Sequence, residues 1–133
     1  MNSFSGHITD VKTNGTMSVV SVQVDGNVEF ISVLLDTPES APYLKKDRSV
    51  KVLFKEMEVA VTTQKDLDIS IENRIAGKIV DVEKGVLLSR LTIETKIGQI
   101  IAILSTLSAG QMGLAEKMNV MIMVKMNEII LAP

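Results

Sequence analysis

Side chains that could hold a small anion occur at matching places in two halves of the chain. Lys55 and Lys125 each follow an apolar run, and Asn2 and Asn73 each lie four residues before a glycine. Hydroxyl groups gather after another apolar run in each half, at Thr37, Ser40, Ser105, Thr106 and Ser108. Hydroxyl, amide and ammonium donors can together bind a small tetrahedral oxyanion without a metal ion. A lysine at a strand end also serves as a solvated guard of a sheet edge, so the residues alone leave both interpretations open.

The residue types give little support for catalysis or for metal binding. The chain has no Cys and one His, His7, which excludes a disulfide scaffold, a zinc finger and thiol catalysis. No serine lies in a Gly-x-Ser-x-Gly turn, and no glycine-rich phosphate loop is present. We therefore expect no enzyme, no cofactor and no metal ligated directly by side chains. A methionine cluster is interpreted as core or interface filling rather than a soft-metal site; it comprises Met112, Met118, Met121, Met123 and Met126.

The composition describes a small globular protein. The 133 residues include 46% hydrophobic and only 3% aromatic residues, and the formal net charge is −2. The apolar fraction excludes a disordered chain, and the near-neutral charge and few aromatics disfavour direct nucleic-acid binding. No apolar run is long enough for a membrane span, and the first residues do not resemble a signal peptide. We expect a cytoplasmic protein without a membrane partner.

The chain is built as two copies of one unit. Residues 5–11 align with residues 76–82 at a shift of 71, and residues 50–61 align with residues 120–131 at a shift of 70. The one-residue difference falls near Asp25, where a turn tolerates a length change. The repeat predicts a first unit at residues 1–65 and a second at residues 69–133.

Each copy has the period of β-strands. Apolar and polar residues alternate over residues 20–24 and 90–95, which places one face on a core and the other in water. Asn14-Gly15 and Asp25-Gly26 are typical of hairpin turns. Residues 50–54 and 120–124 are almost continuously apolar, which predicts strands buried on both faces.

One short segment in each copy departs from the strand pattern. Residues 37–44 begin with an N-cap type residue followed by Pro38, and residues 105–114 hold the corresponding place. We expect one or two helical turns in each segment. The predicted fold class is all-β, with two tandem small Greek-key barrels of the oligonucleotide/oligosaccharide-binding (OB) type, each carrying a short helical segment.

The whole chain resembles the tandem Mop (TOBE) proteins of the molbindin family. The family unit opens with Ser-x-Arg-Asn-x-x-x-Gly, continues into a serine-bearing helix and Gly-Leu-x-x-Gly, and ends with a late Lys before a final apolar strand. The matching residues of the second half are Ser70-Ile71-Glu72-Asn73, Gly77, Ile101 to Ser108, Gly113-Leu114 and Val120 to Lys125. The first half matches in outline at Asn2, Gly6, Ile31 to Ser40, Leu44 and Val50 to Lys55.

The resemblance implies a function and an assembly. Members bind molybdate or tungstate in the cytoplasm, at sites between units of different subunits, so we expect a homo-oligomer, a trimer or a trimer of dimers. Carried over by position, the resemblance assigns oxyanion binding to Ser70, Asn73, Ser105, Ser108 and Lys125 in the second half. In the first half it assigns the same role to Asn2, Thr37, Ser40 and Lys55.

One departure from the family pattern alters the charge of the expected site. Glu72 occupies the place of the family arginine, and a carboxylate about 4 Å from an anion repels it by roughly 1–4 kcal/mol. In the first half that place falls on Met1, and Asp36 lies near the first hydroxyl. Either one class of site is lost, or Glu72 turns away into an ion pair with Arg74 or Lys78.

Three functions follow from these observations. The first is molybdate or tungstate binding for storage or homeostasis. The second is a regulatory or assembly module, of the effector type in molybdate-responsive systems, that has lost its ligand and acts through protein contacts. The third, an oligonucleotide-binding barrel, is disfavoured by the charge and the aromatic content.

Overall fold

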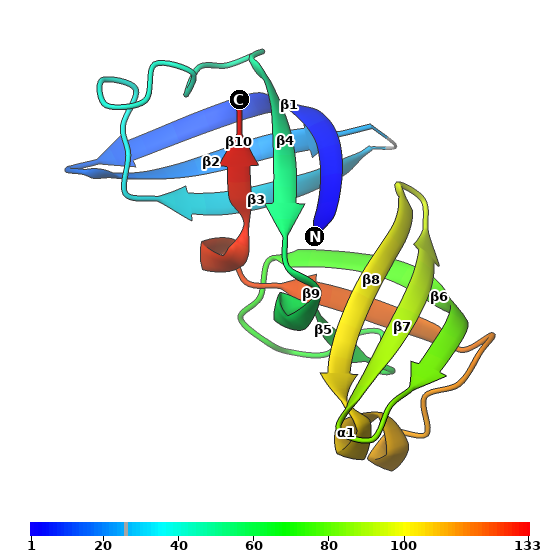
Figure 1. Ribbon diagram of the computed structural model, residues 1–133. Coiled ribbons are helices and arrows are strands. Elements are labelled where there is room, and N and C mark those ends of the chain that lie inside the picture. The colour runs from blue at the N-terminus through cyan, green and yellow to red at the C-terminus, as the bar shows by residue number, and fades with distance from the viewer. Residues whose placement is uncertain (26) are drawn as a thin grey trace.

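The chain folds into two curled antiparallel sheets of five strands each (Figure 1). The computed structural model describes residues 1–25 and 27–133. The first sheet has the order β10-β4-β1-β2-β3 and the second β5-β9-β6-β7-β8, which confirms the predicted fold class. The strands of the first sheet are β1 (Asn2–Asn14), β2 (Met17–Val24), β3 (Val28–Leu34), β4 (Ser49–Phe54) and β10 (Ile130–Ala132). Those of the second are β5 (Ala60–Thr62), β6 (Asn73–Lys84), β7 (Leu88–Thr95), β8 (Gly98–Ser105) and β9 (Asn119–Val124).

The strand periodicity read from the sequence is present in the burial of the strands. Every second residue of β2 is buried, from Ser18 to Val24, and the β1–β2 hairpin turns at Gly15, whose φ of 65° favours glycine. Gly26, at the second predicted turn, lies outside the described residues. The prediction of strands buried on both faces is wrong for β4, which alternates, and holds only toward the end of β9.

The repeat extends to local irregularities. β1 is bulged between Ile8 and Asp10, and β6 is bulged at the matching place, between Ile79 and Asp81. At each bulge the isoleucine carbonyl accepts from a loop residue with positive φ, Asp47 or Lys117, at 2.7 Å. Equal irregularities at equal places show that both halves share one backbone plan.

The short segment after the third strand differs between the halves. In the second half it forms α1 (Thr106–Gln111), with Ser105 as its N-cap. In the first half the N–H of Ala41 donates to the carbonyl of Thr37, and the turn does not continue into a helix. Pro42 accounts for this difference, because it has no N–H to donate and disfavours α conformation in the residue before it. No helix in the described part of the chain is long and apolar enough to cross a membrane.

The final strand of each repeat joins the sheet of the other repeat. After the 3-10 helix η1 (Glu56–Glu58), β5 pairs with β9; after η2 (Met126–Glu128), β10 pairs with β4. Figure 1 shows both crossings between the two sheets. The units predicted at residues 1–65 and 69–133 stay a prediction, and each sheet contains one strand from the other unit.

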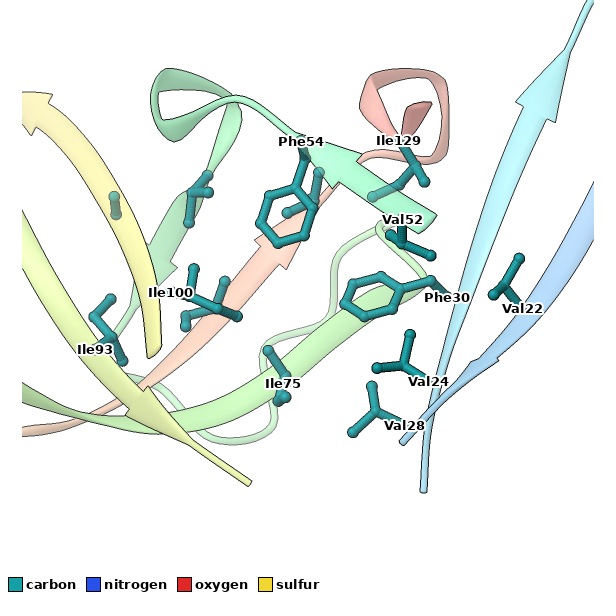
Figure 2. Close-up of a cluster of buried hydrophobic side chains, with 14 of the residues drawn as sticks. Val22, Val24, Val28, Phe30, Val52, Phe54, Ile75, Ile93, Ile100 and Ile129 are labelled. Atoms are coloured by element: carbon teal, nitrogen blue, oxygen red, sulfur yellow. The ribbon is translucent and has the colours of Figure 1, made fainter. Parts of the chain in front are cut away.

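The hydrophobic core runs through this junction. One cluster of buried side chains includes Phe54 and Phe30 from the first half and Ile75 and Ile100 from the second (Figure 2). Phe54 lies 6.0 Å from Phe4 and 5.8 Å from Phe30, measured between ring centroids. Because apolar side chains of both halves share this core, separating the halves would expose it to water.

Candidate functional site

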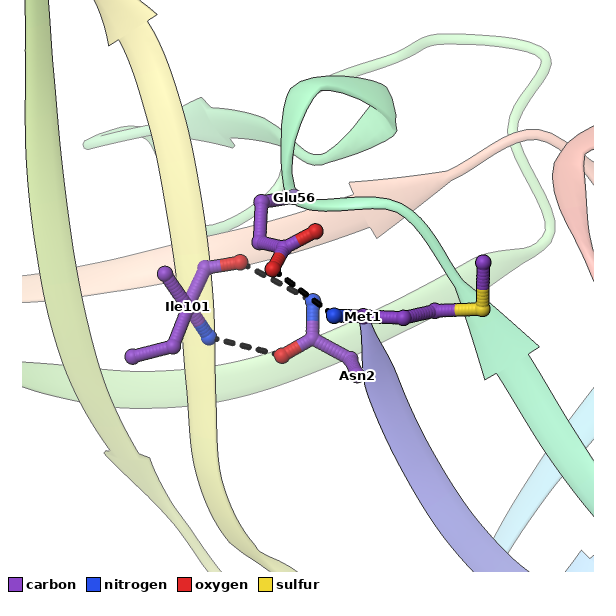
Figure 3. A network of polar contacts seen from close by, with 4 residues as sticks. All are labelled: Met1, Asn2, Glu56 and Ile101. Atoms are coloured by element: carbon purple, nitrogen blue, oxygen red, sulfur yellow. Dashed lines mark hydrogen bonds and ion pairs between the residues drawn. The ribbon is translucent and has the colours of Figure 1, made fainter.

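Asn2 and Asn73 form a reciprocal clamp between the two halves. The Asn2 amide accepts from the N–H of Ile101 at 2.8 Å and donates to its carbonyl at 2.9 Å (Figure 3). The Asn73 amide makes the same two bonds with Ile31, at 2.7 and 2.8 Å. Only 6% of Asn2 and 2% of Asn73 is exposed.

The clamp explains why both halves carry asparagine at this place. β8 and β3 are edge strands, and each amide meets the outward N–H and carbonyl of one residue on such an edge. A buried backbone group without a partner would be destabilising. The two asparagines therefore hold the halves together, and their predicted part in oxyanion binding stays a prediction.

The two repeated lysines lie beside the clamp. Lys55 and Lys125 are exposed and begin the 3-10 helices η1 and η2. Each directly follows the strand residue that pairs with the clamp asparagine: Phe54 with Asn2, and Val124 with Asn73. The fold thus brings the predicted lysine and asparagine of each half to one place, and the ammonium group faces water.

The hydroxyl groups of the second half lie at the far end of the second barrel, around α1 (Figure 1). The Ser105 hydroxyl accepts from the N–H of Ser108 at 3.0 Å. The Thr106 hydroxyl donates to the Gly85 carbonyl at 2.8 Å and lies 2.9 Å from the Ser89 hydroxyl. One chain therefore does not bring these hydroxyls to Lys125.

The hydroxyl groups of the first half have a carboxylate beside them. Ser40 Oγ donates to Asp36 Oδ1 at 3.1 Å, and Thr37 N–H donates to Ser40 Oγ at 2.9 Å. Burial raises the pKa of the nearby Tyr43 hydroxyl, and the charge of Asp36 raises it further. The Asp36 carboxylate beside Ser40 opposes binding of a dianion to these hydroxyls.

Ser70 and Glu72 lie in the segment that leads into β6. Ser70 is exposed. Glu72 takes part in no ion pair within 4.0 Å among the described residues, so neither Arg74 nor Lys78 is the partner considered from the sequence. Arg74 instead donates to the carbonyls of Leu67, Ile69 and Ile71. Because β6 and β9 are antiparallel and Asn73 pairs with Val124, Glu72 lies next to the pair on the side of Lys125.

An ion pair is found at the place in the first half that corresponds to Glu72. The N-terminal ammonium of Met1 lies 2.8 Å from Glu56 Oε2 (Figure 3). The hydrogen bond from this ammonium holds the pKa of Glu56 below its usual value. The sequence did not predict the Met1–Glu56 ion pair or the bonds of the asparagines to Ile101 and Ile31. The two residues of each pair are far apart along the chain, so no local pattern indicates them.

Comparison with known proteins defines the class. Residues 69–131 match the TOBE domain family, so the second half is a TOBE domain, and the first half repeats its strand plan. The resemblance seen in the sequence is thereby confirmed.

A characterised relative is similar to nearly the whole chain. The chain is 24% identical over 132 residues to the molybdenum transport protein ModE of Azotobacter vinelandii, covering 98% of this chain and 49% of ModE. The chain thus spans about half the length of this curated relative.

A solved structure has the same fold. The cytoplasmic molybdate-binding protein ModG, in a form with molybdate bound, superposes with a TM-score of 0.91 at 20% identity, covering 98% of this chain and 94% of ModG. MopII from Clostridium pasteurianum matches with a TM-score of 0.42 at 30% identity, over 44% of this chain and 88% of MopII. The ModG likeness establishes that the fold is shared along nearly the whole chain.

Proposed function

We propose that this protein binds molybdate or tungstate reversibly and serves molybdenum storage or homeostasis in the cytoplasm. The observation that carries the proposal is the exposed lysine beside a buried asparagine, repeated in both halves of a fold shared with molybdate-binding ModG. An ammonium group supplies charge for a dianion, and hydroxyl and backbone N–H groups brought close to it would supply short donors.

The separation of the donor groups favours sites between copies of the chain. Lys125 lies near the junction of the halves, whereas Ser105, Thr106 and Ser108 lie at the far end of the second barrel. A homo-oligomer, a trimer or a trimer of dimers, would let the lysine of one copy meet the hydroxyls of another. Selectivity against sulfate would then follow from the size of the enclosed space, since the charge is the same.

Equilibrium dialysis with molybdate and sulfate at matched concentrations tests the proposal. We expect retention of molybdate at micromolar concentration and little retention of sulfate. Lys125→Ala and Lys55→Ala should each reduce the number of bound ions, whereas Lys46→Ala, on an exposed loop, should not. Absence of molybdate retention by the intact protein would refute the function.

The alternative is a module that has lost its ligand and acts through protein contacts. Its support is the charge at the expected sites: Glu72 near Lys125, and Asp36 bonded to Ser40. Glu72→Arg separates the two functions. A large gain in molybdate affinity would show that the natural site is degenerate, and unchanged affinity would place the site elsewhere.

A further inference from the structure

A groove of about 800 Å³ lies between β6, β9, the turn after β7 and the segment after β5. Its walls carry three lysines from three different segments, Lys65, Lys78 and Lys96. None of the residues predicted to bind the oxyanion lines this groove, so it is a separate surface.

The charge of the groove is positive. Two carboxylates also line it, Asp66 beside Lys65 and Glu94, which pairs in register with Lys78. Among the described residues, none of the three lysines forms an ion pair within 4.0 Å. Three lysines thus line one groove, with only two carboxylates to offset their charge.

The segment that follows Lys65 is hydrogen-bonded to β6. Arg74 donates to the carbonyls of Leu67, Ile69 and Ile71, and the N–H of Gln64 donates to the Thr62 hydroxyl at 3.1 Å. The Arg74 bonds tie the residues after Lys65 to β6, and the Gln64 bond closes a tight turn before it. A wall held in this way presents its ammonium group at a lower entropic cost than a free loop would.

Gly77, which lines the groove, has no room for a side chain. A Cβ on Gly77 would lie 2.6 Å from Ile93 Cγ2 and 2.9 Å from the Glu94 carbonyl oxygen. Gly77 alternates with the buried Ile75 and Ile79, so its missing side chain allows β6 to pack closely on β7 beside the groove.

The corresponding groove of the first half has the same backbone and a different charge. It measures about 480 Å³ and is lined by His7 and Asp25 where the second half has Lys78 and Lys96. Lys51 is the one lysine on its walls. The basic character is therefore a property of the second half, since the shared scaffold does not impose it.

We propose that the second-half groove binds the phosphate chain of a small molecule, as inorganic polyphosphate or as a nucleotide. The space far exceeds a single tetrahedral oxyanion, and separate ammonium groups on three walls suit a chain of several negative charges. Lysine acts on phosphate as a point charge with loose geometric demands, which fits exposed side chains of this kind. The proposal does not depend on molybdate binding.

Isothermal titration with inorganic triphosphate and, separately, with ATP tests the proposal at low ionic strength. Lys96→Ala should weaken triphosphate binding about fivefold, and Glu94→Gln should strengthen it, because a nearby repulsive charge is removed. Lys51→Ala, in the first-half groove, is the matched control and should change nothing. ATP that binds as tightly as triphosphate assigns recognition to the phosphates, and tighter ATP binding with the same loss in Lys96→Ala assigns a nucleotide.

The proposal is overturned if triphosphate does not bind at millimolar concentration. It is also overturned if neither Lys96→Ala nor Glu94→Gln changes the affinity for triphosphate. Circular dichroism of each variant checks that it is folded. Molybdate retention by Lys96→Ala should equal that of the natural protein, which separates failure of this inference from failure of the proposed function.

Discussion

The two halves of this protein share a backbone and differ in the side chains they place on it. Asn2 and Asn73 make the same pair of bonds across the junction, and the bulges and final strands correspond. The packing differs, because the first half has Phe54 and Phe30 where the second half has Val124 and Ile100 at the equivalent positions of the repeat. Both halves therefore retain the asparagine clamp at their junction.

The difference teaches where each half is free to change. Groups that cross the junction have to satisfy buried backbone of the other half, so asparagine is kept twice. Surfaces that face water have no such requirement, and there the halves differ. The second half has Lys78 and Lys96 where the first has His7 and Asp25, and it has α1 where the first has a turn that ends at Pro42.

Breaking the joint should give the largest effect. Asn73→Ala leaves the N–H and carbonyl of Ile31 without partners in a partly buried place, and we expect a loss of about 2–4 kcal/mol in the free energy of unfolding. Asn2→Ala should cost a similar amount if the clamps are equivalent. Urea unfolding monitored by circular dichroism measures both, and a loss below about 0.5 kcal/mol for each would contradict the clamp.

Making the cores alike should cost somewhat less. Phe54→Val copies Val124 and removes a ring that packs on Phe4 and Phe30. We expect a loss of about 2 kcal/mol, below the range for truncation of a buried Phe to Ala. An unchanged unfolding midpoint would show that the first core does not depend on its ring. The reverse change, Val124→Phe, should also destabilise, because it overpacks the second core.

A single hydroxyl provides a finer test of the difference. Ser32 is 1% exposed and donates to the Ile129 carbonyl at 2.8 Å, whereas Ala102 holds the matching place in the second half. Ser32→Ala should cost about 1–2 kcal/mol, because the buried carbonyl loses its donor. The exposed Ser3→Ala is the control. Equal stability of the two variants would mean that the Ser32 bond contributes nothing.

The smallest expected effect concerns Glu56. Because its pKa is lowered in the folded state by the Met1 ammonium, the pair stabilises the protein above the ordinary pKa of about 4.5 and loses its contribution as the pH falls through the folded value. Glu56→Gln should therefore cost less than about 1 kcal/mol near pH 7. The difference from the natural protein should vanish in acid. A difference that grows in acid would contradict this sign.

Much of the fold could be predicted from the sequence, because the repeat and the strand period are local signals. The alternation of β2 and the N-cap at Ser105 are examples. The exchange of β5 and β10 could not be predicted in the same way. These short strands occupy equivalent places in the repeat, and either could pair with β4 or β9, so local sequence does not choose between them.

The candidate site was predictable only in part. Repetition identified Asn2 and Asn73 as special, and the structure shows them bonded to Ile101 and Ile31 across the junction. An amide can bind an anion or a buried backbone, and composition does not tell these partners apart. The partner of Arg74 was also missed, because three backbone carbonyls leave no signal in the sequence.

The most direct test is anomalous diffraction at the molybdenum edge from crystals grown with molybdate. The proposed function predicts molybdenum peaks within reach of the ammonium groups of Lys55 or Lys125, at contacts between copies of the chain. Crystals without such peaks, or with molybdenum bound only at places that these lysines do not reach, would contradict it.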